Sequence, residues 1–146
     1  MDFNWKRHRA ASIDRQSGQH LSLGRRGESY VAGRFRAAGF CLLSKNGRQY
    51  AGVEHDLIVR KERRYYFVEV KTRSTHIEEA TSKLLAWRQY QRLRCAAELY
   101  CNEHLDLIDE FAILLAYVHA TNDGFRLQLF RLEGPQEAIL IDFEQL

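Results

Sequence analysis

The stretch FVEVKTR, residues 67–73, places a glutamate and a lysine inside an otherwise apolar run. Its β-branched and aromatic residues favour a strand. Side chains alternate between the two faces of a strand, so Phe67, Glu69 and Lys71 share one face and the two valines share the other. Charges on a half-buried face are costly unless something neutralises them. The pattern therefore raises the question of what balances Glu69 and Lys71.

The segments around this stretch alternate between helical and strand patterns. Apolar residues at helical spacing predict two helices, and alternating or continuous apolar runs bounded by turn residues predict the strands. The predicted order is helix, three strands, helix and two strands, at residues 22–39, 40–44, 53–60, 64–71, 77–103, 110–118 and 125–132. This order predicts a single α/β domain over residues 21–146, preceded by a basic arm at residues 1–20.

Composition narrows the class of protein. A chain of 146 residues buries a sufficient core without disulfides, and its three cysteines form no CxxC pair. No apolar run is long enough for a membrane helix, and we expect a cytoplasmic protein without a membrane partner. The net charge is +3, and up to residue 48 ten lysines and arginines face three acidic residues. This charge permits a nucleic-acid partner without requiring one.

Hairpin geometry brings a second carboxylate to Glu69. With a loop at residues 61–64, Arg60 and Tyr65 close the hairpin, and Asp56 then lies directly opposite Glu69. Like charges in directly opposed positions destabilise a sheet. The same alternation turns His55 to the other face, so we expect it to be a structural histidine.

A third carboxylate comes from the first helix. At 100° per residue, Glu28 lies about 20° from Phe35 on the helical wheel, and we expect it to face inward. Two interpretations follow. Either Lys71 and Arg73 form ion pairs with Glu69 and Asp56 at a sheet edge, or Glu28, Asp56 and Glu69 bind Mg²⁺ or Mn²⁺, hard cations that prefer oxygen ligands.

Several motifs in register resemble a known family. They are LGRRGESYVAGRFRAAGF (23–40), Asn46 and Arg48, EHDLIV (54–59) and FVEVKTR (67–73). Together they resemble the small bacterial YraN-like proteins, an uncharacterised family of the restriction-endonuclease-like superfamily, and their layout is similar to that of archaeal Holliday-junction resolvases. The resemblance covers roughly the first half of the chain. It implies a restriction-endonuclease-like fold, a mixed central β-sheet flanked by helices.

The resemblance also implies an activity and roles for the site residues. The activity is that of a Mg²⁺-dependent endodeoxyribonuclease that hydrolyses DNA phosphodiester bonds, with branched DNA as the suggested substrate. Asp56 and Glu69 would ligate the metal ion, with the Val70 carbonyl as a third ligand. Lys71 would orient or help to deprotonate the attacking water, and Glu28 would complete the site through a water or a second metal ion.

The second half of the chain matches the family weakly, which keeps an alternative open. The chain could be a nucleic-acid-binding or assembly module that retains the fold with little or no catalysis. A homodimer would suit a two-fold symmetric substrate, and the sequence leaves the oligomeric state open.

Candidate phosphate contacts surround the acidic residues. Thr72 and Arg73 directly follow Lys71, and the basic residues of the second helix form either a solvated face or a phosphate-binding one. The nucleic-acid contacts that we predict are Arg73, Thr72, Arg48, Lys83, Arg88 and Arg92.

Overall fold

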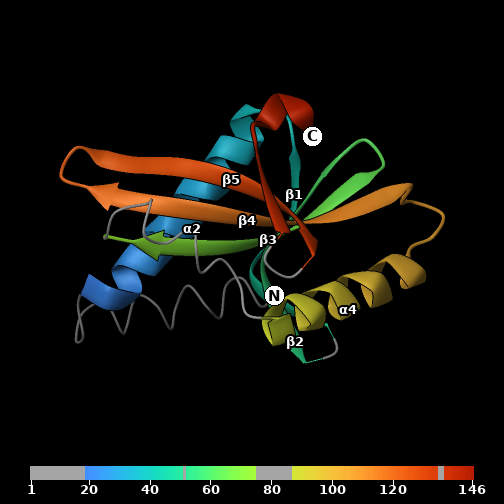
Figure 1. Ribbon diagram of the computed structural model, residues 1–146. Helices are drawn as coiled ribbons and strands as arrows, with labels where there is room; N and C mark the ends of the chain where they lie inside the picture. Colours follow the sequence, from blue (N-terminus) through green and yellow to red (C-terminus); the bar gives the residue numbers. More distant parts are fainter. Residues whose placement is uncertain (1–18, 51, 75–86, 135–136) are drawn as a thin grey trace.

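A computed structural model describes residues 19–50, 52–74, 87–134 and 137–146 (Figure 1). Two helices, α2 (Gln19–Ala37) and α4 (Trp87–Glu103), accompany one six-stranded sheet, and a 3-10 turn, η2 (Phe143–Gln145), ends the chain. The strands are β1 (Cys41–Tyr50), β2 (Val53–Lys61), β3 (Arg64–Arg73), β4 (Glu110–Thr121), β5 (Gly124–Gly134) and β6 (Glu137–Ile141). The arm predicted at residues 1–20 lies almost wholly outside the described residues, as does the predicted start of the second helix at residue 77.

The sheet is mixed, and its strand order follows the chain from β1 to β6. The β3–β4 pair is parallel and every other neighbouring pair is antiparallel. Parallel neighbours need a crossover connection, and α4 lies in the segment between them. The α/β class and the mixed sheet flanked by helices are therefore confirmed.

The two helices cover opposite faces of the sheet. On one face Val31 and Phe35 of α2 pack with Val68 of β3. On the other face Tyr90 and Tyr100 of α4 belong to the same cluster as Phe67 and Leu115. The run Ala112–Val118 is buried at every position, as predicted for a strand covered on both sides. The alternation within FVEVKTR thus assigns Phe67 to the α4 face and Val68 to the α2 face.

The β2–β3 hairpin has the predicted register but a tighter turn than predicted. Arg60 pairs with Tyr65 as expected, and Lys61 also pairs with Arg64. The loop at residues 61–64 is therefore wrong: the turn consists of Glu62 and Arg63. Glu62 adopts a φ of 56°, a conformation for which glycine or asparagine would be the usual turn signal. Neither residue occurs at this turn, which explains why the predicted loop is too long.

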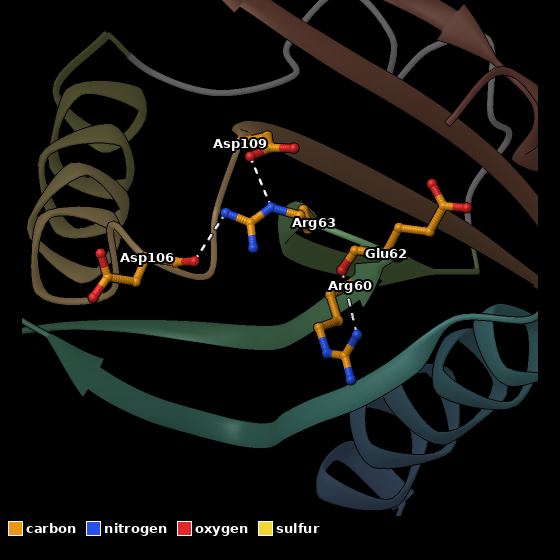
Figure 2. Close-up of polar contacts among 5 residues, drawn as sticks. All are labelled: Arg60, Glu62, Arg63, Asp106 and Asp109. Carbon is orange, nitrogen blue, oxygen red and sulfur yellow. Dashed lines mark hydrogen bonds and ion pairs between the residues drawn. The ribbon is translucent and has the colours of Figure 1, made fainter.

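Arg63 connects this turn to the loop that leads into β4 (Figure 2). Its Nε donates to Asp109 Oδ1 at 2.8 Å and its Nη2 donates to the Asp106 carbonyl at 2.9 Å. The Asp109 amide donates in return to the Arg63 carbonyl at 2.9 Å. These contacts hold the starts of β3 and β4 side by side, and the parallel register then runs from Arg64 to Arg73.

Two further elements differ from the sequence prediction. β1 continues to Tyr50 instead of ending at residue 44, through register shifts and without apolar alternation. β6 is absent from the predicted order, because its apolar run at residues 138–141 is too short to distinguish a strand from other structure. Within the described ranges, neither helix is long and apolar enough to span a membrane.

Candidate active site

The paired backbones of β2 and β3 stop beside Asp56. Their ladder runs from Lys61↔Arg64 to Leu57↔Val68, and the next contact comes from a side chain. The Val70 amide donates a hydrogen bond to Asp56 Oδ2 at 2.8 Å. This bond fixes the Asp56 carboxylate against β3, next to Glu69.

The face of β2 changes at Asp56, which sequence alternation did not predict. Leu57 belongs to the α2-side cluster, whereas Val53 packs against the α4-side cluster. The His55 ring lies 4.9 Å from the ring of Phe67, which is also on the α4 side. His55 is thus a buried structural histidine, but the face predicted for it is wrong. Strict alternation fails at Asp56, where the β1–β2 register shifts between Lys45 and Arg48 and the β2–β3 ladder ends.

The Asp56 and Glu69 carboxyl groups share a hydrogen bond, with Glu69 as the donor. Burial first, and then the charge of Asp56, raise the pKa of Glu69 to about 8. Burial also raises the pKa of Asp56, although the Val70 amide, the Glu69 hydrogen bond and Lys71 act in the opposite direction. Two carboxylates this close cannot both ionise cheaply, so the pair retains a proton near neutral pH.

Lys71 and Glu28 complete the charged surroundings of the pair. The Lys71 ammonium lowers the pKa of both Asp56 and Glu69, and the Glu28 carboxylate raises that of Glu69. Glu28 is half-buried at this end of the sheet. The structure thus brings together Glu28, Asp56, Glu69 and Lys71 as one electrostatic group.

A close approach of α2 to β3 positions Glu28. A Cβ at Gly27 would collide with Thr72, and its distance from the Thr72 Cβ would be 2.9 Å. Gly27 is the residue that allows the helix backbone to reach the strand. Glu28 follows it directly and is carried to the strand end that bears Glu69.

The residues predicted to contact phosphate lie in different parts of the structure. Arg73 is exposed on the face of Lys71, whereas Thr72 points to the α2 face and its hydroxyl is buried. Arg88 and Arg92 are exposed on α4. The Arg48 side chain and Lys83 lie outside the described part of the structure. Arg73 is therefore the predicted contact that the structure places on the face of Lys71 in β3.

The carboxylate oxygens of Asp56 and Glu69 suit a hard divalent cation whose other ligands are waters. No group of three or more His, Cys, Asp or Glu side chains among the described residues could hold a metal ion. Asp56 and Glu69 supply two carboxylates, and a cation bound to both would favour their ionised forms. Mg²⁺ is typically held by one or two carboxylates together with waters and phosphate oxygens. The residues present fit that mode of binding.

Two polar residues near the site were not found from the sequence. Tyr117 and Gln128 each bury a side-chain oxygen, Oη and Oε1, that has no hydrogen-bond partner in the structure as described. Tyr117 lies in a nearly continuous apolar run, and Gln128 lies in a strand that alternates polar and apolar residues. The signal that finds them is the register of β4 with β3 and β5, which the sequence does not give.

Sequence comparisons give a family for the chain. The model of the family described as "Uncharacterised protein family UPF0102" matches residues 27–116. A UPF0102 protein of Shewanella sp. strain ANA-3 is 34% identical over 109 residues, which cover 72% of this chain and 100% of the relative. One from Syntrophotalea carbinolica is 40% identical over 92 residues, 60% of this chain and 72% of the relative. One from Clostridium botulinum strain Loch Maree is 25% identical over 112 residues, 75% and 90% of the two chains.

Proposed function

The chain belongs to the uncharacterised family UPF0102, the YraN-like family of endonuclease-like proteins, and from this premise we propose that it is a metal-dependent endonuclease that hydrolyses phosphodiester bonds in DNA. The observation that carries the proposal is the convergence of two carboxylates and a lysine: the Val70 amide holds the Asp56 carboxylate against β3 beside Glu69, and Lys71 acts on both. Two carboxylates, with waters and phosphate oxygens as the remaining ligands, are the usual protein contribution to a Mg²⁺ site.

Each residue of the group would have a distinct task. Asp56, held by the Val70 amide, and Glu69 would hold Mg²⁺ or Mn²⁺, with the Val70 carbonyl as a further oxygen ligand. A bound cation would lower the pKa of a coordinated water and offset negative charge on the phosphate. Lys71 would place a compact positive charge beside the attacking water, and Glu28 would accept a hydrogen bond from a water at the edge of the site.

DNA is the proposed substrate because the site lies among basic residues. Arg73 follows Lys71 on the same face, and the net charge of the whole chain is +3. Resemblance to Holliday-junction resolvases suggests branched DNA. Phosphate contacts of this kind position a substrate without reading its sequence.

Cleavage of a DNA panel tests the proposal. Labelled duplex, flap, single-stranded and four-way-junction DNA would be incubated with purified protein in Mg²⁺, Mn²⁺ or EDTA. The test variant is Asp56→Asn, which keeps an acceptor for the Val70 amide and removes the charge. The matched control is Asp106→Asn, because Asp106 uses its carbonyl and not its carboxylate in the contact with Arg63.

We expect metal-dependent cleavage by the wild type and by Asp106→Asn, and a loss of at least about a hundredfold in Asp56→Asn. Equal behaviour of the wild type and Asp56→Asn on every substrate would reject the nuclease. Binding without cleavage on all four substrates would instead support the binding-module alternative.

A further inference from the structure

Strand register places two rows of polar residues beside the carboxylate pair. Lys71 of β3 is the partner of Tyr117 on β4, and Tyr117 is the partner of Gln128 on β5. Lys71, Tyr117 and Gln128 form the inner row. The outer row, next to it on the same face, consists of Arg73, His119 and Arg126. Both rows continue the α4 side of the sheet, because Phe67, Tyr117 and Phe130 all belong to the α4-side cluster.

These rows lie at the end of the sheet away from α4. Figure 1 shows the β4–β5 hairpin projecting at the left, while α4 runs along the lower right. The side chains of α4 that are buried with the sheet, such as Leu93 and Tyr100, pack with Tyr65 and Phe67, which precede Glu69 in β3. Tyr117 belongs to the margin of this packed region, and the row of Arg73, His119 and Arg126 lies beyond it.

The outer row carries positive charge that the described residues do not neutralise. Arg73 and Arg126 are both exposed. Neither forms an ion pair within the described ranges, and Arg73 donates a hydrogen bond to the Thr72 carbonyl at 2.9 Å. The other arginine of β5, Arg131, points to the opposite face and is paired with Glu133 at 3.0 Å. Strand β5 thus has one unpaired arginine on the site face and one paired arginine on the other.

The inner row contains two of the buried oxygens that have no hydrogen-bond partner among the described residues. Tyr117 Oη and Gln128 Oε1 lie on directly paired residues, next to the register position of Lys71. A buried polar atom without a partner costs about 1–3 kcal/mol, so such atoms call for a ligand or an ordered water. The inner row therefore has hydrogen-bonding capacity that no described residue uses.

We propose that one strand of a nucleic acid runs from the carboxylate pair across the ends of β3, β4 and β5, with Arg73 and Arg126 bound to its phosphates and Tyr117 and Gln128 forming the polar floor beneath it. The inference rests on the proposed function, since the carboxylate pair sets where the strand begins. Three neighbouring strands span about 10 Å, which corresponds to about three phosphates of one DNA strand. The partner is a polyanion because the row offers unpaired guanidinium groups.

Binding without catalysis tests this surface. Fluorescence anisotropy of labelled duplex and single-stranded DNA would be measured in EDTA over a range of salt concentrations. The test variant is Arg126→Gln and the matched control is Arg131→Gln, on the same strand with the same change in charge. We expect Arg126→Gln to weaken binding about fivefold to tenfold near 0.1 M salt, and to reduce the salt slope by about 0.7 on single strands or 0.9 on duplex.

The outcomes separate this inference from the nuclease proposal. Weaker binding and a shallower slope in Arg126→Gln alone would support the surface, whether or not the wild type cleaves DNA in Mg²⁺. Identical binding by the Arg126→Gln and Arg131→Gln variants would overturn the surface, and cleavage by the wild type in Mg²⁺ would then leave the nuclease standing. A wild type that binds neither probe would also overturn the surface.

Discussion

The Val70 amide donates a 2.8 Å hydrogen bond to the carboxylate of Asp56, and this contact takes over where the β2–β3 ladder ends. A backbone donor on one strand is satisfied by a side chain from its neighbour. The same carboxylate shares a proton with Glu69. One residue therefore both completes the hydrogen bonding of the sheet and builds the candidate site.

The Asp56–Val70 hydrogen bond predicts different stabilities for two neutral variants. Asp56→Asn keeps an acceptor for the amide, whereas Asp56→Ala leaves the amide without one. Both remove the negative charge, so their difference isolates the hydrogen bond. We expect the alanine variant to be less stable than the asparagine variant by about 1–3 kcal/mol in urea unfolding. Equal stabilities would show that the bond does not hold the strands.

The contact between Gly27 and Thr72 predicts a steric effect that is specific to one glycine. A Cβ at Gly27 would collide with Thr72, whereas a Cβ at Gly33 of the same helix meets nothing within 4 Å. We expect Gly27→Ala to lower the free energy of unfolding by about 1–3 kcal/mol, from overpacking. Gly33→Ala should raise it by about 0.5–1 kcal/mol, through helix propensity.

Rescue of the Gly27→Ala variant supplies the check. Thr72→Ala removes two of the three atoms that the new methyl group would meet, so the double variant should recover part of the loss. Thermal unfolding of the four proteins measures the coupling. Additive effects of the two substitutions would contradict a direct contact between α2 and β3.

Much of the fold follows from periodicity, and the errors have local causes. The run Ala112–Val118 is apolar at every position, and Phe67 and Val68 alternate between two cores, so these strands are predictable. The turn at Glu62 is not, because a glutamate with positive φ gives no turn signal. The face of His55 is not predictable either, since alternation fails where the β1–β2 register shifts and the β2–β3 ladder ends.

The candidate site divides in the same way. Asp56 and Glu69 can be brought together from hairpin register alone, because their separation in the chain is short. Tyr117 and Gln128 cannot, since their neighbours depend on a parallel pairing between strands separated by a helix. Long-range register of this kind is set by tertiary contacts, among them the Arg63–Asp109 ion pair.

Burial of His55 predicts a pH-dependent contribution to stability. Desolvation lowers the pKa of His55 from 6.5 to about 4, and its Nε2 has no partner in the described structure. The unfolded chain binds a proton at this histidine below pH 6.5 and the folded chain does not, so the contribution of His55 to stability is lost as the pH falls from 6.5 toward about 4. The raised pKa of Glu69 acts in the opposite direction, because the folded chain keeps a proton that the unfolded chain releases. His55→Phe keeps an aromatic ring against Phe67, and its stability relative to the wild type should increase as the pH falls through this range.

Urea unfolding at a series of pH values measures the His55 effect. His104→Phe is the control, because it removes a half-buried histidine at the end of α4 and leaves His55 in place. The control should keep the slope of the wild-type profile. Profiles of equal slope for His55→Phe and the wild type between pH 6.5 and 4 would contradict a buried neutral His55.

Calorimetric titration of the protein with Mn²⁺ tests the central claim that Asp56 and Glu69 together bind a divalent cation. The pair retains a proton with a pKa of about 8, and a cation must displace it. We predict that Mn²⁺ affinity rises about tenfold per pH unit up to about pH 8, and that Glu69→Gln abolishes binding. Identical Mn²⁺ isotherms for the wild type and Glu69→Gln, at about pH 6.5 and again at about pH 8.5, would contradict the account.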